Sequence, residues 1–442
     1  MASIAQKKLF GWKEVENLGD LDRLRLVLEN LPDEELMQAM EGVRGKGRDD
    51  YPVRSVWNSV IAGIVFGHDS IASLHRELLR NGQLRELCGF DLFRGEDAVP
   101  RHYVYSRFLR SLIKHQDKVD AMFEKLVDSV SEELPEFGTS LAIDSKAIQT
   151  HAKKKWKGTT KKKRDGRRDI DADTGVKTYK GTKDDGSLWE KVKSWFGYKL
   201  HLIVDSDYEL PVAYTVTKAS RNDIPIARRM LRDLKRNRAH ILRDCEYLSA
   251  DRGYDDGELN RSLWDDYGIK PVIDIKNVWK DGEKTRMISR ADNVVHDFRG
   301  TMYCYCPHSG ECREMAYGGF EKDRNTLKYR CPATHYGLSC KGEAECPVRG
   351  SIRIPLSEDR RIFTPLARSS YKWKTAYKKR TAVERVNGRL DVSFGFEHHF
   401  IRGKKKMKLR CSLALCVMLA MALGRIRENQ KEKMRSLVTA TG

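Results

Sequence analysis

The sequence predicts a mixed α/β protein in which an all-α N-terminal domain precedes a sheet that a cysteine-rich segment interrupts. Three observations support this fold class. Apolar residues repeat at helical spacing through about the first 135 residues. Short apolar or alternating runs between residues 140 and 275 are typical of strands. Six of the 10 cysteines fall between residues 304 and 346.

Charge and composition limit the class of partner. The 442 residues include 83 Lys and Arg against 63 Asp and Glu, a net charge of +20, which favours a polyanion such as nucleic acid. The N-terminus lacks the apolar core of a secretory signal. The most apolar run, Cys411 to Leu423, is shorter than the roughly 18 residues of a membrane span and predicts a buried helix. We therefore expect a cytoplasmic, nucleoid-associated protein with reduced thiols and no membrane partner.

Residues 1–135 form the first predicted domain, a helical one. Leu21, Leu24 and Leu28 recur at helical spacing. A single long helix is predicted from Val104 to Leu134, and the first half of this helix carries basic and aromatic side chains. That face fits DNA phosphates, so the domain is a candidate for binding DNA ends, and it fits an ordinary solvated surface equally well.

The sheet is predicted over residues 136–276. Ser140 to Asp144 is a short apolar strand that ends in an acid, and a hairpin follows between residues 196 and 217. A helix, a fourth strand that runs into Asp251, a second helix and a last strand complete the order β-β-β-α-β-α-β. This is the order of an RNase H-like fold, in which the first and fourth strands are neighbours. Asp144 and Asp251 are therefore expected to meet.

Three further features of this region need an interpretation. The stretch from His151 to Arg168 is so rich in Lys and Arg that we expect a loop that becomes ordered on an anion. Trp156 in its middle is a candidate for stacking on a base. Lys177 to Lys193 is equally polar, and no strand is predicted there. Asp205 also ends a strand, and we interpret it as a hairpin-turn residue.

The stretch from Tyr371 to Leu390, in a domain predicted over residues 364–430, reads as a basic helix with one acid. Tyr377, Arg380 and Glu384 stand at i, i+3 and i+7 and share one face of that helix. An ordinary Arg380–Glu384 surface pair, worth a few tenths of a kcal/mol, is the alternative interpretation.

The three acids Asp144, Asp251 and Glu384 suggest metal-dependent chemistry if the chain brings them together. Clustered carboxylates repel one another and are costly without cations. Oxygen ligands suit Mg²⁺ or Mn²⁺. Two such ions about 4 Å apart activate an attacking oxygen and stabilise a leaving one, which is the chemistry of phosphodiester cleavage.

Residues 277–363 are predicted as an insertion before the last catalytic helix. Bound zinc would stabilise the fold of a segment that is too small to build its own core. The spacing is not that of two Cys-x2-Cys pairs, so reduced cysteines packed as small apolar residues are the alternative. The candidate zinc ligands are Cys304, Cys306, Cys312, Cys331, Cys340 and Cys346.

The motifs together resemble a known family. Strand-borne Asp144, the block Ala250–Tyr254 and Tyr377-x2-Arg380-x3-Glu384 resemble bacterial insertion-sequence transposases of the DDE superfamily. The subgroup is the one marked by a Tyr-x2-Arg-x3-Glu-x6-Lys signature, and the resemblance covers most of the chain.

One position departs from that signature, because Asp391 stands where the lysine is expected. We expect Arg389 to supply the missing positive charge. The segment Phe196–His201, which includes Lys199, also looks like the family.

The resemblance implies an activity. Asp144, Asp251 and Glu384 would hold two Mg²⁺ (or Mn²⁺) ions, so that a transposon end is nicked and its 3′-OH joined to target DNA. Terminal inverted repeats and target, both double-stranded DNA, would be the partners, and two copies would form a homodimer in the synaptic complex. The insertion would be β-rich and near the DNA. The residues expected to contact DNA are Tyr377, Arg380, Arg389, Lys199 and Trp156.

Two other functions stay open at this point. One is an RNase H-like nuclease that hydrolyses without joining strands. The other is a non-catalytic, zinc-dependent DNA-binding protein.

Overall fold

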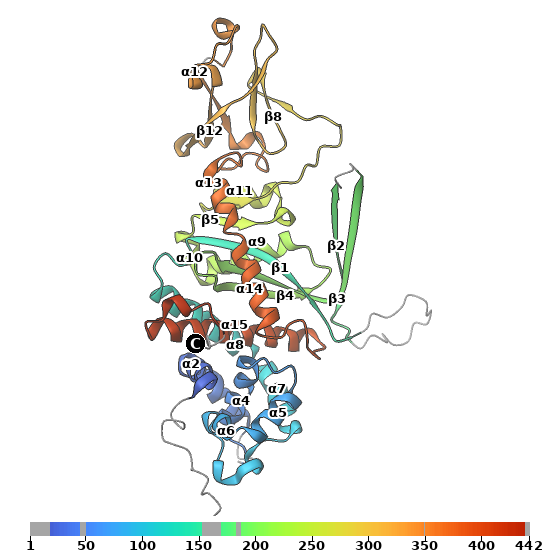
Figure 1. Cartoon of the computed structure of the whole chain (residues 1–442), viewed down its shortest axis with the longest axis vertical. Helices are drawn as coiled ribbons and strands as arrows, with labels where there is room; N and C mark the ends of the chain where they lie inside the picture. Colours follow the sequence, from blue (N-terminus) through green and yellow to red (C-terminus); the bar gives the residue numbers. More distant parts are fainter. Residues whose placement is uncertain (1–17, 45–49, 153–168, 183–186, 349, 438–442) are drawn as a thin grey trace, which may run out of the picture.

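The N-terminal part of the chain is helical (Figure 1). The computed structural model describes residues 18–44, 50–152, 169–182, 187–348 and 350–437. The helices are η1 (Gly19–Leu21), α2 (Asp22–Asn30), α3 (Glu34–Arg44), α4 (Val53–Val65), α5 (Ile71–Arg80), α6 (Gly82–Leu87), η2 (Leu92–Ala98), α7 (His102–Lys114) and α8 (Gln116–Glu133). The single helix predicted from Val104 to Leu134 is wrong, because the backbone leaves the helical region at His115 (φ −104°, ψ 33°).

The central sheet contains the five predicted strands and one further strand, β2. Its strands are β1 (Ser140–Gln149), β2 (Asp173–Thr182), β3 (Leu188–Asp205), β4 (Pro211–Lys218), β5 (Tyr247–Ala250) and β6 (Lys270–Ile273). Strand β1 lies between β3, which is antiparallel to it, and β5, which is parallel to it. Strand β4 pairs with β3 on one side and β6 pairs with β5 on the other. The order β4-β3-β1-β5-β6 is RNase H-like, and the predicted fold class is confirmed.

Two features of the sheet differ from the prediction. Strand β3 is about twice as long as expected, and its first half pairs with β2 as a two-stranded ribbon. Figure 1 shows this ribbon (green) standing away from the body of the protein. The stretch from Lys177 to Lys193 therefore contains two strands where none was predicted, because its lysines hide the alternation.

The helices between the strands follow the expected order. They are α9 (Asp223–Asn237), α10 (Ala239–Asp244), η3 (Arg252–Tyr254) and α11 (Gly257–Asp265). The side chain of Asn222 accepts a hydrogen bond from the backbone N–H of Ile224 and begins α9, as predicted. Helix α9 packs on β3 and β4, and α11 packs on β6.

The insertion forms two small sheets, ordered β10-β9-β8-β7 and β11-β12-β13. Its elements are β7 (Arg286–Ile288), β8 (Ala291–His296), β9 (Met302–Tyr305), β10 (Cys312–Glu314), β11 (Ala316–Glu321), η4 (Lys322–Arg324), β12 (Thr326–Arg330), α12 (Pro332–Tyr336), η5 (Glu343–Glu345), β13 (Ser351–Pro355) and η6 (Leu356–Glu358). Residues such as Val294, Met302 and Leu327 form a buried cluster distinct from that of the main body.

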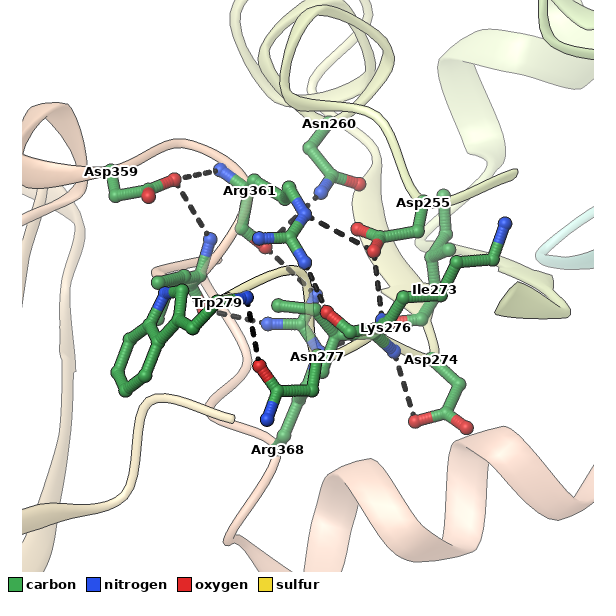
Figure 2. A network of polar contacts seen from close by, with 12 residues as sticks. Asp255, Asn260, Ile273, Asp274, Lys276, Asn277, Trp279, Asp359, Arg361 and Arg368 are labelled. Carbon is green, nitrogen blue, oxygen red and sulfur yellow. Dashed lines mark hydrogen bonds and ion pairs between the residues drawn. The ribbon is translucent and has the colours of Figure 1, made fainter. Parts of the chain in front are cut away.

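A network of hydrogen bonds and ion pairs connects the two ends of the insertion, next to the end of β6 (Figure 2). The buried Arg368 donates hydrogen bonds to the backbone carbonyls of Ile273, Ile362 and Arg361 at 3.1, 2.6 and 3.0 Å. Arg361 in turn donates to Asp255 at 3.1 Å. The outgoing and returning chain are therefore tied to each other and to the loop that follows β5.

The C-terminal part completes the core. It consists of α13 (Tyr371–Lys378), α14 (Thr381–Val392), α15 (Lys404–Arg427) and η7 (Lys431–Lys433). Helix α15 packs against α2, α8 and β4, so the N-terminal helices and the sheet share one buried apolar cluster. Helix α15 alone among the described residues is long and apolar enough to span a membrane, but 89% of its apolar window is buried, as in a core helix. The predicted helix from Tyr371 to Leu390 is in fact α13 and α14, separated at Lys379 and Arg380.

Candidate active site

Two of the predicted acids lie side by side on neighbouring inner strands, at the carboxyl end of β5. Ile143 on β1 and Ala250 on β5 are paired in the parallel register. Asp144 and Asp251 are the residues that follow this pair on the two strands. Because the two strands are parallel, the residues that follow a paired couple lie next to each other. The sheet therefore brings together two acids that are 107 residues apart in the chain.

The electrostatics of Asp144 reflect this placement. Burial and, after it, the charge of Asp251 raise the pKa of Asp144 to about 6, although Lys177 and Arg380 oppose the shift. A carboxylate that is disfavoured as an anion is one that a cation would stabilise.

The loop after β5 holds Asp251 in a fixed orientation. The side chain of Asp251 folds back and accepts a hydrogen bond at 2.7 Å from the backbone N–H of Gly253. A Cβ at residue 253 would lie only 2.7 Å from Asp251 Oδ1, so any other residue there would displace this carboxylate. Asp144 Oδ1 likewise accepts from the backbone N–H of Ser145 at 2.7 Å. Within the described residues, no hydrogen bond uses the Oδ2 atom of either carboxylate, and both Oδ2 atoms are free to take a ligand.

Glu384, the third predicted acid, lies in the first turn of α14 and is held by a neighbour. Arg380 Nη1 lies 2.8 Å from Glu384 Oε1, and the Glu384 side chain is about half exposed. The Arg380 guanidinium also lies 5.6 Å from the centre of the Tyr377 ring, which stacks on Trp373 at 4.7 Å. Arg380 is near enough to Asp144 to affect its pKa. Arg380 thus links Glu384 to the site that Asp144 and Asp251 form.

Long-range ion pairs fix α14 against the sheet. Lys146, two residues after Asp144 on β1, donates to Asp391 on α14. Arg385 and Arg389 both pair with Glu209 in the β3–β4 turn. The position of Glu384 is therefore set by contacts at both ends of its helix.

Two predicted DNA-contacting residues are occupied inside the protein. Arg389 is largely buried against Glu209, at 3.7 Å, and burial lowers its pKa to about 10. Lys199 is buried and donates to the backbone carbonyl of Arg221 at 2.9 Å and to Asp223 at 2.8 Å. The charges of Arg389 and Lys199 are paired within the protein in this structure, and contact of either residue with DNA remains a prediction.

The two remaining predictions have different outcomes. Trp156 lies outside the described residues. Asp205 accepts hydrogen bonds from the backbone N–H groups of Gly138, Asp207 and Tyr208, which confirms its prediction as a turn residue.

The structure adds charged residues that the sequence analysis did not select. Asp274 follows β6, next to the β5 end, and pairs with Arg252 at 2.5 Å and with Arg299 of the insertion at 3.6 Å. An apolar strand that ends in an acid, the pattern that identified Asp144, would have found Asp274. Lys177, whose Nζ lies 3.5 Å from the carbonyl oxygen of Ser145, had no comparable signal.

The donor set fits a divalent cation only in part. Asp144 and Asp251 provide adjacent hard oxygen ligands. Among the residues that the structure describes, no three His, Cys, Asp or Glu side chains are grouped so that they could hold a metal ion. Glu384 is thus not yet part of a three-carboxylate cluster in this conformation.

The cysteines of the insertion gather but do not form such a group either. Hydrogen bonds from the Ser309 side chain and backbone lower the pKa of Cys306 to about 6, and Cys306 also contacts Cys340. Burial is the main cause of the raised pKa of Cys304, and the nearby thiols of Cys331 and Cys346 raise this pKa further. Zinc binding by these cysteines, and by Cys312, remains a prediction.

Comparisons with known proteins identify the family. A model of the transposase DDE domain matches residues 135–420, which is more than half of the chain, and this protein therefore belongs to the DDE transposase family. A comparison with curated protein sequences returns no match. Among solved structures, the chain is similar to a cryo-EM structure of a piggyBac transposase synaptic complex with hairpin DNA. The identity is 12% and the TM-score 0.41, over 94% of this chain and 79% of the other.

Proposed function

We propose that this protein cleaves DNA at the ends of a mobile element and joins the freed 3′-OH to target DNA. The observation that carries the proposal is the pair of adjacent acids, Asp144 and Asp251, at the edge of an RNase H-like sheet in a chain of the DDE transposase family. The net charge of +20 supports a DNA substrate.

The acids of the site would hold divalent cations. Asp144 and Asp251 would supply the fixed carboxylates, and Glu384 would complete the set. Bound Mg²⁺ or Mn²⁺ would activate the attacking oxygen and neutralise charge on the leaving oxygen.

Arg380 would change partner when DNA binds. In the structure its guanidinium pairs with Glu384 and lies beside the Tyr377 ring. A DNA phosphate is a strong bidentate partner for arginine, so Arg380 would turn to the phosphate and release Glu384 to the cations. Tyr377 would contact the same strand. This exchange explains why the third acid stands outside the cluster without DNA.

The test is cation-dependent cleavage of the element's own end sequence. We expect Glu384→Gln to abolish cutting while DNA binding is retained, because an amide is a much poorer cation ligand than a carboxylate. Glu258→Gln is the matched control, because Glu258 is also an exposed helix acid paired with an arginine, Arg261, at 3.2 Å. Equal cutting by wild type and Glu384→Gln would remove Glu384 from the chemistry.

A pre-nicked end separates a transposase from a nuclease. With such an end and a target duplex, strand transfer gives a joined product, whereas an enzyme that only hydrolyses gives none. The same assay at increasing protein concentration would show whether two copies are needed.

A further inference from the structure

The β2–β3 ribbon has two chemically different faces. Residues directly opposite each other in its register lie on the same face, and neighbours along a strand alternate. One face carries Lys177, Lys191 and Lys193 between Trp195 near the base and Trp189 further out. We call this the lysine face. The other face carries Thr, Ser and aliphatic residues, including the exposed Val176 and Val192, and further out one oppositely charged pair, Lys180 and Glu190.

The ribbon is ordered by two indole rings. Trp195 and Trp189 cover Gly175 and Gly181, their cross-strand partners, so closely that a Cβ on either glycine would come within 2.4 or 2.5 Å of the ring. Trp195 also donates from Nε1 to the backbone carbonyl of Tyr198 at 3.0 Å. An isolated two-stranded hairpin is only marginally stable, and these packed rings contribute to the stability of the ribbon.

The lysine face concentrates positive charge. Lys177 and Lys193 are directly opposite each other in the register. Lys191 lies on the same face and is exposed. Three lysines on one face of a narrow ribbon would attract an anion.

The lysine face is also turned towards the acids. Lys177 Nζ lies 3.5 Å from the Ser145 carbonyl oxygen, and its charge lowers the pKa of Asp144. A polyanion held at Asp144 would thus lie beside Lys177 at the base of the ribbon.

From these observations we propose that the β2–β3 ribbon is a DNA-binding arm, whose lysine face contacts the phosphates of the duplex held at Asp144 and Asp251. The inference rests on the proposed function, and it assigns the arm a role that is separate from the chemistry. A two-stranded ribbon has dimensions that the major groove of DNA admits. The aliphatic face is turned away from the duplex.

The experiment is a salt titration of DNA binding by the full-length protein in EDTA. The probe is a fluorescein-labelled 30-base-pair duplex of arbitrary sequence, followed by anisotropy. Each lost phosphate contact lowers the slope of log K against log salt by about 0.9. The double variant Lys191→Gln/Lys193→Gln is therefore expected to lower the slope by about 2 and to weaken binding on the order of tenfold or more at 0.1 M salt.

Two controls keep the result interpretable. Val192→Thr lies between the two lysines in sequence but on the other face, and it should bind DNA as wild type does. Lys191→Arg/Lys193→Arg keeps both charges and should restore binding, which excludes a loss caused by misfolding.

Two outcomes would overturn the proposal. One is an unchanged slope in the Lys→Gln double variant. The other is unchanged DNA affinity in the Lys→Gln double variant together with loss of self-association in Val192→Thr. The ribbon would then bind a second copy of the chain. Because the assay needs no cation and no cleavage, lysine-dependent binding can hold even if the cleavage test fails, and the two proposals are judged separately.

Discussion

The raised pKa of Asp144 has a consequence for stability that can be measured without substrate. Asp144 binds its proton more tightly in the folded protein, with a pKa of about 6, than in the unfolded chain, where the value is 3.8. Because the folded state binds more protons between these two pKa values, the contribution of Asp144 to the free energy of unfolding falls as pH rises from about 4 to about 6. This contribution stays low at higher pH. The perturbation is Asp144→Asn, which keeps the shape and removes the charge.

The magnitude follows from the shift. A pKa raised from 3.8 to about 6 corresponds to roughly 3 kcal/mol. Asp144 keeps some contact with solvent, so we expect Asp144→Asn to stabilise the protein by about 1–3 kcal/mol at pH 8 in EDTA. At pH 5 the gain should fall to about half, since the folded protein is then mostly protonated at Asp144.

The assay is urea unfolding followed by tryptophan fluorescence at both pH values. Asp169→Asn is the control with the opposite sign, because Asp169 is buried and accepts hydrogen bonds from Thr150, Tyr198 and the backbone N–H of Gly403, which hold its pKa below the usual value despite burial. It should destabilise by about 1–3 kcal/mol at pH 8. Equal or lower stability of Asp144→Asn at pH 8 would refute the reasoning.

The same protein offers three further tests. Arg368→Lys should lower the melting temperature and expose residues 276–279 to protease, because lysine cannot reach the three carbonyls that the guanidinium fork binds; an unchanged digest would contradict this. Exchange of the partly buried pair as Lys146→Asp/Asp391→Lys should recover most of the stability that either single change loses, and additive losses in a double-mutant cycle would mean that the pair is not coupled. Zinc in the insertion should appear as about one or two equivalents of metal in protein purified without chelator, and metal-free protein that melts unchanged would favour reduced, packed cysteines.

Local patterns in the sequence were sufficient for the order of the sheet. The strand that begins at Ser140, the block at Asp251 and the cap at Asn222 each depend on a few neighbouring residues, and each is found where expected, although β1 continues past Asp144 to Gln149. Apolar alternation and capping are short-range signals, so they can be identified without knowing the fold.

The same reasoning failed where long-range contacts decide. The ribbon was missed because its strands carry lysines on one face and are stabilised by Trp–Gly pairs across the strands, which no local pattern reveals. The break between α13 and α14 and the break at His115 were missed because both stretches have acceptable helical spacing.

What the sequence determined by itself is the set of chemical groups and their order along the chain: two strand-borne acids, a basic helix with one acid, and a cysteine-rich insertion. What the tertiary structure decided is the partner of each charge. Arg389 was expected on DNA and lies against Glu209, whereas Lys177 comes within reach of Asp144. The physical reason is that an ion pair depends on distances between residues far apart in sequence, and only the folded chain sets those distances.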